Sequence, residues 1–456
     1  MSTIHKFKQE NDYYILDVNS GAIHVVDELV YDIVGQDSLM DKKYILDKYK
    51  KKYTQKEINE VYEEINELIK EELLYSKDLY EDIGLKAGEG ESYIKALCLN
   101  IAHDCNLRCK YCFADEGEYK GKRELMSADI GKKAIDFVIK NSGPRKHIEV
   151  DLFGGEPLIA FDTVKEIVEY AKVEEKKHNK EIRFTMTTNG TLLNDEIMKY
   201  IDENMGNIVL SIDGRKEVND RVRITRDNRG SYDNILPKIK SMVKMRDKDK
   251  QYYVRGTFTR ENLDFFKDIM HLVNEGFNEV SIEPVVLPEE HPLSLREEDL
   301  PKIFEEYDKL CKEMIKAKKE GKKFKFYHFN IDLQGGPCVY KRISGCGAGH
   351  EYVAITPSGD IYPCHQFVGN QDFIMGNLNN ANEEGINKDI QKYFKEGNIY
   401  FKPECKECWA RFYCSGGCQS NNYNFSGDIK NPYKLGCEMQ KKRIECAIAL
   451  KYNVME

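Results

Sequence analysis

The chain has 456 residues, of which 41% are hydrophobic, enough for two or three domains with cores of their own. The 69 basic and 78 acidic residues give a net charge of −9, and no basic tract is interleaved with aromatic residues, so nucleic acid is not expected as a partner. No segment reaches the apolar length of a membrane span and no secretory signal is visible, which predicts a cytoplasmic protein without a membrane partner. Fourteen cysteines in a reducing compartment are more typical of metal ligands than of disulfides.

The first 85 residues predict a small module of strands and helices. Two strand-like runs, 13–17 and 22–26, are joined by a turn that contains glycine. A helix follows, because apolar residues recur at three- and four-residue steps from Ile58 to Leu73. The polar, glycine-rich stretch 86–92 then reads as a linker, so we place a first domain at 1–85.

Strands alternate with amphipathic helices over residues 93–320, which predicts an α/β fold. Six such repeats make a parallel sheet, either curled into a partial (β/α)6 barrel of the TIM type or opened as a doubly wound sheet. In both arrangements, residues that carry chemistry are expected at the C-terminal ends of the strands. The candidate strands are 95–101, 148–153, 182–187, 208–212, 254–258 and 279–283.

The third region, 337–450, is rich in cysteine and has few long periodic runs, so its fold is expected to depend on metal. The stretch from Thr356 to Asp360 contains the Pro and Gly of a tight turn. That turn would bring Cys346 and Cys364 to one end of a hairpin.

Cys105, Cys109 and Cys112 form the most informative motif, spaced Cys-x3-Cys-x2-Cys. Three thiolates hold three corners of a four-iron cluster and leave the fourth iron open, whereas ferredoxin-type runs supply a full set of ligands. Structural zinc, the alternative, takes four ligands. With the aromatic Tyr111 before the last cysteine, the motif resembles that of the radical SAM enzymes. In these oxidoreductases the cluster cleaves S-adenosylmethionine (SAM) to methionine and a 5′-deoxyadenosyl radical, which ends as 5′-deoxyadenosine.

The resemblance implies a SAM-binding set at the strand ends. Glycine lets backbone approach a ligand closely, and Gly154-Gly155-Glu156 resembles the motif that contacts the SAM amino group, although such a turn also ends ordinary strands. Arg223 resembles the clamp on the SAM carboxylate, while Arg221 is expected to be solvated. His103 is expected to be structural. The implied set is Tyr111, Phe113, Gly154, Gly155, Glu156, Ser211, Asp213 and Arg223, with Ser211 and Asp213 at the ribose and Phe113 over the adenine or the cluster.

Seven cysteines of the third region resemble the SPASM domain, which holds auxiliary [4Fe-4S] clusters in radical SAM enzymes that modify peptides. The resemblance implies three [4Fe-4S] clusters in all. Cys405, Cys408, Cys414 and Cys437 would ligate one auxiliary cluster fully, and Cys346, Cys364 and Cys418 would ligate the other, with an open iron unless Cys338 joins them. The alternative is a pair of zinc knuckles, the second completed by His350 or His365. Cys98, Cys311 and Cys446 are expected to be core thiols.

Residues 4–26 resemble the start of the maturases of SCIFF peptides, precursors with six cysteines in forty-five residues, which are grouped with ranthipeptides and sactipeptides. The resemblance implies a winged helix-turn-helix-like first domain that binds the leader of a ribosomally made, Cys-rich precursor as an added strand. A purely structural or dimerising domain is the alternative. The implied reaction is a thioether crosslink between a Cys sulfur and an acceptor carbon, with an electron donor such as ferredoxin or flavodoxin. Carbon-carbon crosslinking and sulfatase-maturation-type oxidation remain open, and a non-catalytic electron carrier would not need the strand-end motifs.

Overall fold

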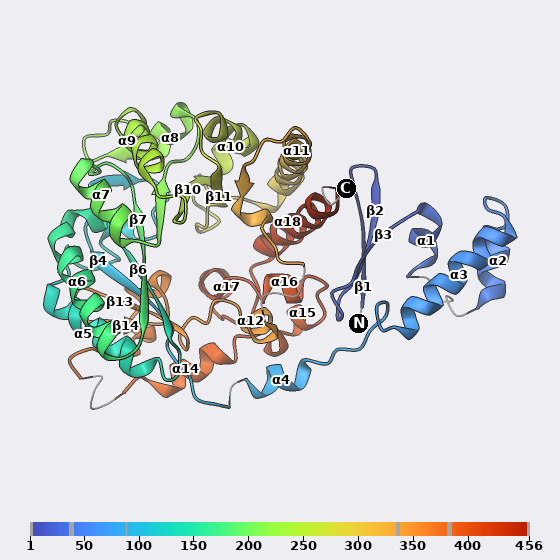
Figure 1. Ribbon diagram of the computed structural model, residues 1–456, viewed down its shortest axis with the longest axis horizontal. Helices are drawn as coiled ribbons and strands as arrows, with labels where there is room; N and C mark the ends of the chain where they lie inside the picture. Colours follow the sequence, from blue (N-terminus) through green and yellow to red (C-terminus); the bar gives the residue numbers. More distant parts are fainter. Residues whose placement is uncertain (1–2, 36–40, 88, 334–337, 381–384, 454–456) are drawn as a thin grey trace.

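The computed structural model describes residues 3–35, 41–87, 89–333, 338–380 and 385–453. An α/β core occupies one side of the molecule, and the N-terminal sheet and its helices stand at the other side (Figure 1). The C-terminal segments lie between these two parts and along the lower edge of the core. Within the described residues, no helix is both long and apolar enough to cross a membrane.

The N-terminal region is a three-stranded antiparallel sheet, in the order β1-β2-β3, followed by helices. Both predicted strands and the predicted helix are present, and Ile58, Val61 and Ile65 form the buried stripe of that helix. The helix ends at Lys70, so Leu73 lies beyond it. The first strand, β1, was not predicted. The elements are β1 (Ile4–Gln9), β2 (Asp12–Asp17), β3 (Ile23–Val26), α1 (Glu28–Ile33), α2 (Lys42–Tyr49), α3 (Gln55–Lys70) and α4 (Glu81–Lys86). The winged helix-turn-helix likeness and the limits of the three domains stay predictions.

A ten-stranded sheet forms the core, in the order β12-β11-β10-β8-β7-β6-β4-β13-β14-β15. All six predicted strands are present, and they pair in parallel with their neighbours. The strands are β4 (Ala96–Ala102), β6 (His147–Gly154), β7 (Glu181–Thr188), β8 (Asn207–Ser211), β10 (Gln251–Phe258), β11 (Glu279–Pro284), β12 (Lys325–Phe326), β13 (Tyr352–Ile355), β14 (Asp360–Tyr362) and β15 (Gly376–Asn377).

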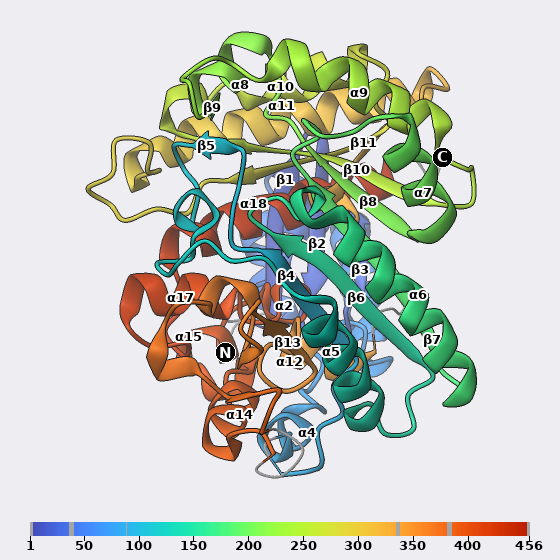
Figure 2. The ribbon, with the colours of Figure 1, turned by 90° about the vertical axis from the view of Figure 1, so that its left-hand side faces the viewer.

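From β4 to β12 the order of the strands in the sheet follows the chain in one direction. The doubly wound alternative is therefore wrong, because in that fold the order reverses. Right-handed crossovers to successive neighbours place the connecting helices on one face of the sheet, as Figure 2 shows. A partial barrel needs this strand order, and the barrel itself stays a prediction. The helices are α5 (Ala128–Asn141), α6 (Phe161–Lys177), α7 (Asp195–Asn204), α8 (Lys216–Val222), α9 (Tyr232–Met245), α10 (Phe265–Asn274) and α11 (Leu300–Lys319).

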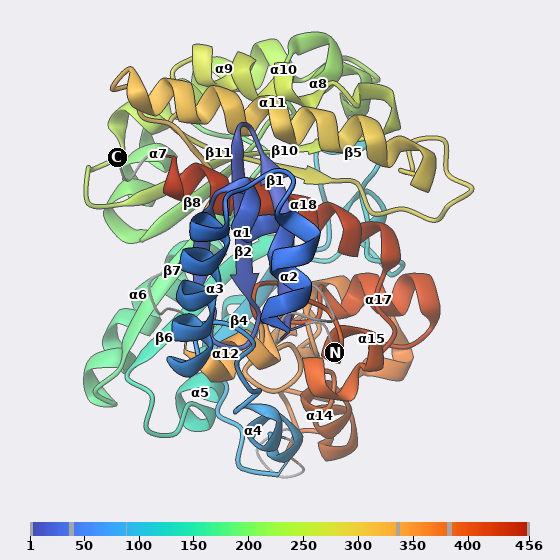
Figure 3. The same cartoon turned by 90° about the vertical axis from the view of Figure 1, so that its right-hand side faces the viewer.

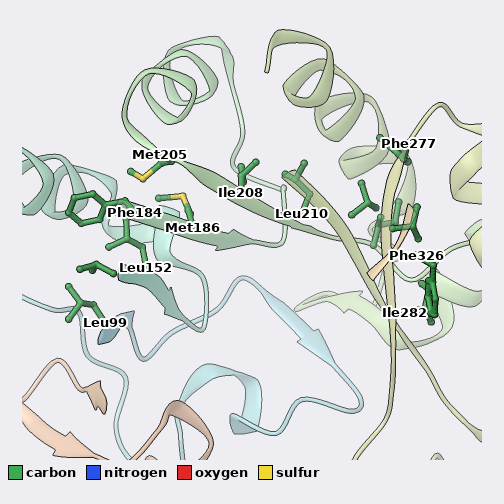
Figure 4. Close-up of a cluster of buried hydrophobic side chains, with 14 of the residues drawn as sticks. Leu99, Leu152, Phe184, Met186, Met205, Ile208, Leu210, Phe277, Ile282 and Phe326 are labelled. Atoms are coloured by element: carbon green, nitrogen blue, oxygen red, sulfur yellow. The ribbon is translucent and has the colours of Figure 1, made fainter. Parts of the chain in front are cut away.

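Buried side chains of neighbouring strands hold the sheet together (Figure 4). Leu152, Met186 and Ile208 come from three successive strands, and none of them is exposed. Burial of each such side chain stabilises the fold by about 1.5–3 kcal/mol. This packing holds the strands side by side. Because the strands pair in parallel, their C-terminal ends lie at the same edge of the core.

The C-terminal region adds to the core sheet through a hairpin. β13 pairs in parallel with β4 and antiparallel with β14, which confirms the hairpin predicted around Thr356–Asp360. At its other end, Gly349 N donates to Pro363 O at 2.9 Å, beside Cys364 and three residues after Cys346. The remaining helices are α12 (Val339–Ser344), α14 (Lys388–Lys395), α15 (Pro403–Lys406), α16 (Arg411–Cys414), α17 (Gln419–Ser426) and α18 (Lys434–Tyr452).

The N-terminal sheet rests on α18, as Figure 3 shows. His5 Nε2 lies 2.9 Å from Glu445 Oε1, and the His5 ring stacks on Trp409 with 3.6 Å between ring centroids. The segment after α3 also contacts the C-terminal region, since Tyr400 Oη donates to Asp78 at 2.9 Å. The first module is thus attached to the cysteine-rich segments at several points.

Candidate active site

A cavity of about 760 Å³ opens between the C-terminal ends of the core strands and the cysteine-rich segments. Cysteines of both regions line it. From the core come Cys105, Cys109 and Cys112, and from the C-terminal region come Cys414, Cys418 and Cys437.

The core cysteines follow β4 in a loop that is tied to a distant segment. The short strand β5 (Leu107–Cys109) pairs antiparallel with β9 (Arg223–Thr225), and Cys109 lies opposite Arg223. Burial raises the pKa of the Cys105 thiol to about 12 and that of the Cys109 thiol to about 11, although Arg223 opposes the rise at Cys109. Buried thiols of this kind ionise when they bind a metal cation, so the donor set fits a cluster with three thiolate ligands.

Gly154 and Gly155 line the cavity, and the cysteine loop requires both of them. Gly154 has a φ of 126°, and a Cβ there would lie 2.4 Å from Ala102 O. A Cβ on Gly155 would lie 2.2 Å from Asp104 O. The glycines therefore let β6 approach the loop before Cys105, in addition to leaving room for a ligand.

Glu156 does not line the cavity, although it was predicted to bind SAM. Its buried carboxylate accepts hydrogen bonds from Thr188 Oγ1 and Asn189 N, both at 2.7 Å. Burial raises the pKa of Glu156 to about 7, and these hydrogen bonds act against the rise. Its position fits a role in holding the end of β7, and direct contact with SAM stays a prediction.

Tyr111, Asp213 and Arg223 form a hydrogen-bonded chain. Tyr111 Oη donates to the Asp213 carboxylate, whose oxygens lie 2.6 and 2.9 Å away, and Arg223 Nη1 donates to Tyr111 Oη at 3.0 Å. Thr257 N also donates to Asp213, at 3.0 Å. Burial raises the pKa of Asp213 to about 6, against the effect of Arg223. Tyr111, Arg223 and Ser211 line the cavity, whereas Asp213 lies behind its wall.

The Nε of Arg223 is buried and has no hydrogen-bond partner among the described residues. A buried unpaired donor of this kind fits an anionic ligand, as the clamp on the SAM carboxylate requires. Arg221, by contrast, is directed to the surface and donates to Glu261 O at 3.1 Å, as expected of a solvated neighbour.

Aromatic rings close the cavity beside Cys112. Phe113 is 46% exposed, and its ring lies 6.0 Å from that of Tyr119 and 5.7 Å from that of His365. His103 lies outside the lining, where it stacks on Tyr119 at 4.6 Å and hydrogen-bonds Asn100 at 3.2 Å. The structural role predicted for His103 agrees with this position.

The C-terminal cysteines interact with one another, and the two ligand sets stay predictions. Cys405 interacts electrostatically with Cys414, Cys437 and Cys408, and burial raises the pKa of its thiol to about 12. Cys364 interacts in the same way with Cys418 and Cys346, and burial raises the pKa of its thiol well above the usual range. No three His, Cys, Asp or Glu side chains in the described part of the chain surround a single metal-ion position.

The other candidate ligands lie apart from these contacts. Cys338 is exposed and precedes α12. His365 Nδ1 hydrogen-bonds Tyr352 Oη at 3.1 Å. His350 is buried against Ala348 O, and its Nε2 has no partner among the described residues. Cys98, Cys311 and Cys446 are buried in the core, as predicted.

One wall of the cavity carries charged side chains that were not predicted. His328 Nε2 lies 3.1 Å from Glu283 Oε1, and Arg443 Nη1 lies 3.4 Å from His328 Nδ1. Arg255 Nε lies 3.7 Å from Glu283 Oε1. Arg255 and Glu283 stand in the C-terminal halves of β10 and β11, so the strand-end rule would have found them, but nothing in the sequence pointed to His328 or Arg443.

Asn189 belongs to a strand-end motif of the sequence, but no role was predicted for it. Its Nδ2 lies 3.7 Å from Cys105 Sγ and 2.8 Å from Asn106 Oδ1, so it touches the cysteine loop directly. Arg226 donates to the carbonyl of Cys105 and to Asp104. Asn189 follows β7 in a Thr-Thr-Asn-Gly motif at the same strand edge, which was a usable signal.

Two protein-family models match the chain. Residues 99–273 match the Radical SAM superfamily, and residues 346–409 match the iron-sulfur cluster-binding domain SPASM. The chain therefore contains a radical SAM core and a SPASM domain, which indicates a SAM-dependent enzyme with [4Fe-4S] clusters.

The individual proteins that resemble this chain have low sequence identity to it. A cysteine-type anaerobic sulfatase-maturating enzyme of Clostridium novyi is 26% identical over 75% of this chain and 92% of its own length. The radical SAM cyclopropyl synthase TigE of Paramaledivibacter caminithermalis is 22% identical over 98% of this chain and 94% of its own. In structure, Streptococcus suis SuiB bound to precursor peptide SuiA has a TM-score of 0.53 at 16% identity, over 94% of this chain and 97% of its own. That likeness concerns the fold.

Proposed function

We propose that the protein is a radical SAM peptide maturase that forms thioether crosslinks between Cys sulfurs and acceptor-residue carbons of a Cys-rich precursor. One observation carries the proposal: the cavity is lined by thiols of the core motif and by thiols of both C-terminal sets. A peptide in this space would meet the radical-generating site and an auxiliary cluster together. Holding two reactants in one site supplies much of the rate of such a reaction.

Within this proposal, each part of the core site has a role toward SAM. Cys105, Cys109 and Cys112 hold a cluster with an open iron. Arg223 binds the SAM carboxylate, and Tyr111 and Asp213 hold Arg223 in place. When bound, the cluster and SAM supply the radical that removes a hydrogen atom from a carbon of the acceptor residue.

The three-thiol set binds the sulfur partner. Cys346, Cys364 and Cys418 would hold a cluster with fewer protein ligands than irons, and that cluster would supply a binding place for the sulfur of a substrate Cys. Such binding would favour the thiolate and fix the position of the sulfur, so no protein base would be required there. The same cluster would supply an acceptor for the surplus electron of carbon-sulfur bond formation.

The N-terminal sheet holds the leader of the precursor. β3 is the edge strand opposite β1, and its Val25 is 49% exposed, so we place the added strand there, beside the hydrogen bond that Tyr452 Oη of α18 donates to Ile23 O. The precursor found with the structurally similar SuiB supports a peptide substrate. An electron donor such as ferredoxin or flavodoxin and a cytoplasmic location belong to the same proposal.

A second candidate uses the same cavity for another radical modification of a peptide. The names of the relatives favour it, because they include sulfatase-maturating enzymes and a cyclopropyl synthase. Carbon-carbon crosslinking and oxidation of a Ser or Cys side chain are the two forms of this alternative.

The test is turnover of a short Cys-rich peptide, sought as an open reading frame beside the gene for this chain, after anaerobic reconstitution with iron, sulfide and SAM. The product should lose two hydrogens and one alkylatable thiol for each crosslink. Loss of two hydrogens with all thiols still alkylatable would indicate either a carbon-carbon crosslink or oxidation of a Ser side chain, and only the oxidised Ser would react with an aldehyde-specific reagent. Loss of sulfur would indicate oxidation of a Cys side chain. The variant with Cys105, Cys109 and Cys112 replaced by Ala is the control without radical chemistry.

A further inference from the structure

A fully buried lysine lies beside the C-terminal cysteines. Lys402 directly precedes α15, its exposed fraction is 0%, and its Nζ donates to Gly416 O at 2.8 Å. Asn422 Nδ2 donates to the same carbonyl at 3.2 Å. Among the described residues, Lys402 forms no ion pair with a carboxylate, so its charge has no acidic partner of the usual kind.

The carbonyl that Lys402 binds belongs to the loop that joins the two cysteine sets. Gly416 lies between Cys414, of the four-thiol set, and Cys418, of the three-thiol set. Burial lowers the pKa of the Lys402 ammonium, and four thiols oppose this effect. They are Cys405 and Cys414 of the four-thiol set and Cys418 and Cys346 of the three-thiol set. The ammonium therefore lies near thiols of both sets.

The loop is shaped around this side chain. Ser415, Gly416 and Gly417 have φ values of 56°, 82° and 74°, a run of left-handed backbone that glycine adopts without strain. A Cβ on Gly416 would lie 3.1 Å from Lys402 Nζ and 3.3 Å from its Cδ. Two glycines and one strained serine thus bring the Gly416 carbonyl close to the ammonium.

Burial of an ammonium is unfavourable unless negative charge lies nearby. The negative groups near the Lys402 ammonium are the cysteine thiolates that would ligate iron. In the proposed clusters, the total negative charge of the thiolates exceeds the positive charge of the iron-sulfur core. A positive charge beside a cluster favours its reduced form, since reduction adds one negative charge. One lysine between two clusters acts on both.

We propose that Lys402 is a positioning residue that raises the reduction potential of both auxiliary clusters and fixes the loop between them. This inference rests on the proposed function, which supplies the two clusters. In that reaction a C–H bond and an S–H bond are replaced by one C–S bond. The hydrogen atom of the C–H bond goes to the 5′-deoxyadenosyl group, the S–H proton goes to solvent, and one electron is left for the auxiliary clusters to accept. Lys402 favours that transfer.

The test compares Lys402→Met, which removes the charge at similar volume, with Lys402→Arg, which keeps it. Lys395→Met is the matched control, because Lys395 is also buried and donates to a carbonyl, that of Gly90, away from the cysteines. The full-length protein also carries Cys105, Cys109 and Cys112 replaced by Ala, so only auxiliary clusters are observed. Iron and sulfide are assayed, and the midpoint potentials are measured by electron paramagnetic resonance during anaerobic redox titration.

Lys402→Met should keep its iron and shift the reduction equilibrium of both clusters at least about tenfold toward the oxidised form, which is about 59 mV for one electron. Lys402→Arg and Lys395→Met should leave both potentials unchanged. Unchanged potentials in an intact Lys402→Met protein would overturn this inference and leave the proposed function standing. Absence of auxiliary iron from the parent protein would overturn the proposed function itself.

If Lys402→Met loses iron, Lys402→Arg decides the matter. Retained iron and parental potentials in Lys402→Arg support the electrostatic role, because the charge alone then restores the clusters. Loss of auxiliary iron from both variants would show that the clusters depend on the particular shape and hydrogen bond of the Lys402 side chain and not on its charge, and would overturn the inference.

Discussion

Cys109 and Arg223 face each other across the two-stranded pair β5–β9, so a proposed cluster ligand and a proposed SAM clamp share one backbone register. Any movement of one strand moves both groups. The hydroxyl of Tyr111 connects this pair to the core sheet, because Asp213, to which it donates, follows β8. Cluster and SAM are thus expected to bind as a coupled unit.

Arg223→Lys should weaken SAM binding roughly tenfold to hundredfold, since an ammonium replaces a fork that hydrogen-bonds both Tyr111 and a carboxylate. Equilibrium dialysis with labelled SAM on the reconstituted protein measures this. Arg221→Lys is the control, because Arg221 is exposed. The affinity of this variant for SAM should match that of the parent protein. Equal affinity in both variants would show that another group holds the carboxylate.

Gly155→Ala should cost the protein one cluster, because a Cβ at 2.2 Å from Asp104 O pushes the loop before Cys105 out of position. Iron content should fall by about four per chain, with auxiliary iron retained. Gly90→Ala is the control, since nothing lies within 4 Å of a Cβ there. A full iron content in Gly155→Ala, with normal SAM cleavage, would contradict the packing seen at the strand end.

Cys338→Ala should leave the three-thiol cluster intact, whereas Cys346→Ala should remove it, because Cys346 and Cys418 interact electrostatically with Cys364 and Cys338 is not among these partners. In Cys338→Ala, a Cys-containing precursor should still perturb the spectrum of that cluster, and the same precursor with Cys replaced by Ser should not. Loss of the cluster from Cys338→Ala would mean closed coordination. A protein base would then have to activate the substrate thiol.

A precursor without its leader should be modified up to ~1000-fold more slowly than the full precursor, because tethering to the N-terminal sheet gives effective concentrations on the order of millimolar. The rate of thioether formation by mass spectrometry measures this, and 5′-deoxyadenosine production should persist with either peptide. Free leader should inhibit turnover of the full precursor. Equal rates for both precursors would show that the N-terminal sheet has only a structural role.

The six core strands could be predicted because each is a short run of mainly apolar or β-branched residues, and four of them are followed by a motif. Strand β1 was not predicted, because its sequence, Ile-His-Lys-Phe-Lys-Gln, is mostly polar. β5 and β9 are three residues long and pair across more than a hundred positions, and no local pattern reports such a contact.

The cysteine sets were predicted from the resemblance to the radical SAM and SPASM motifs, but the directions of the acidic side chains could not be predicted. Glu156 and Asp213 stand at strand ends, as predicted, yet both are turned into hydrogen-bond networks behind the cavity. The direction of a side chain at a strand end is decided by the turn that follows the strand, and not by the alternation of side chains along the strand. His328 and Arg443 reach the cavity by packing of segments distant in the chain, which sequence order does not reveal.

Because β13 pairs with β4, the C-terminal hairpin is part of the core sheet. If the radical SAM core were produced alone, β6 would be the one named strand paired with β4 among the described residues. The other edge of β4, which is hydrophobic, would then be unpaired and would favour self-association. The cysteine-rich region thus also acts as the edge cap of the catalytic sheet, and the separation between the core and auxiliary sites is set by backbone hydrogen bonds rather than by a hinge.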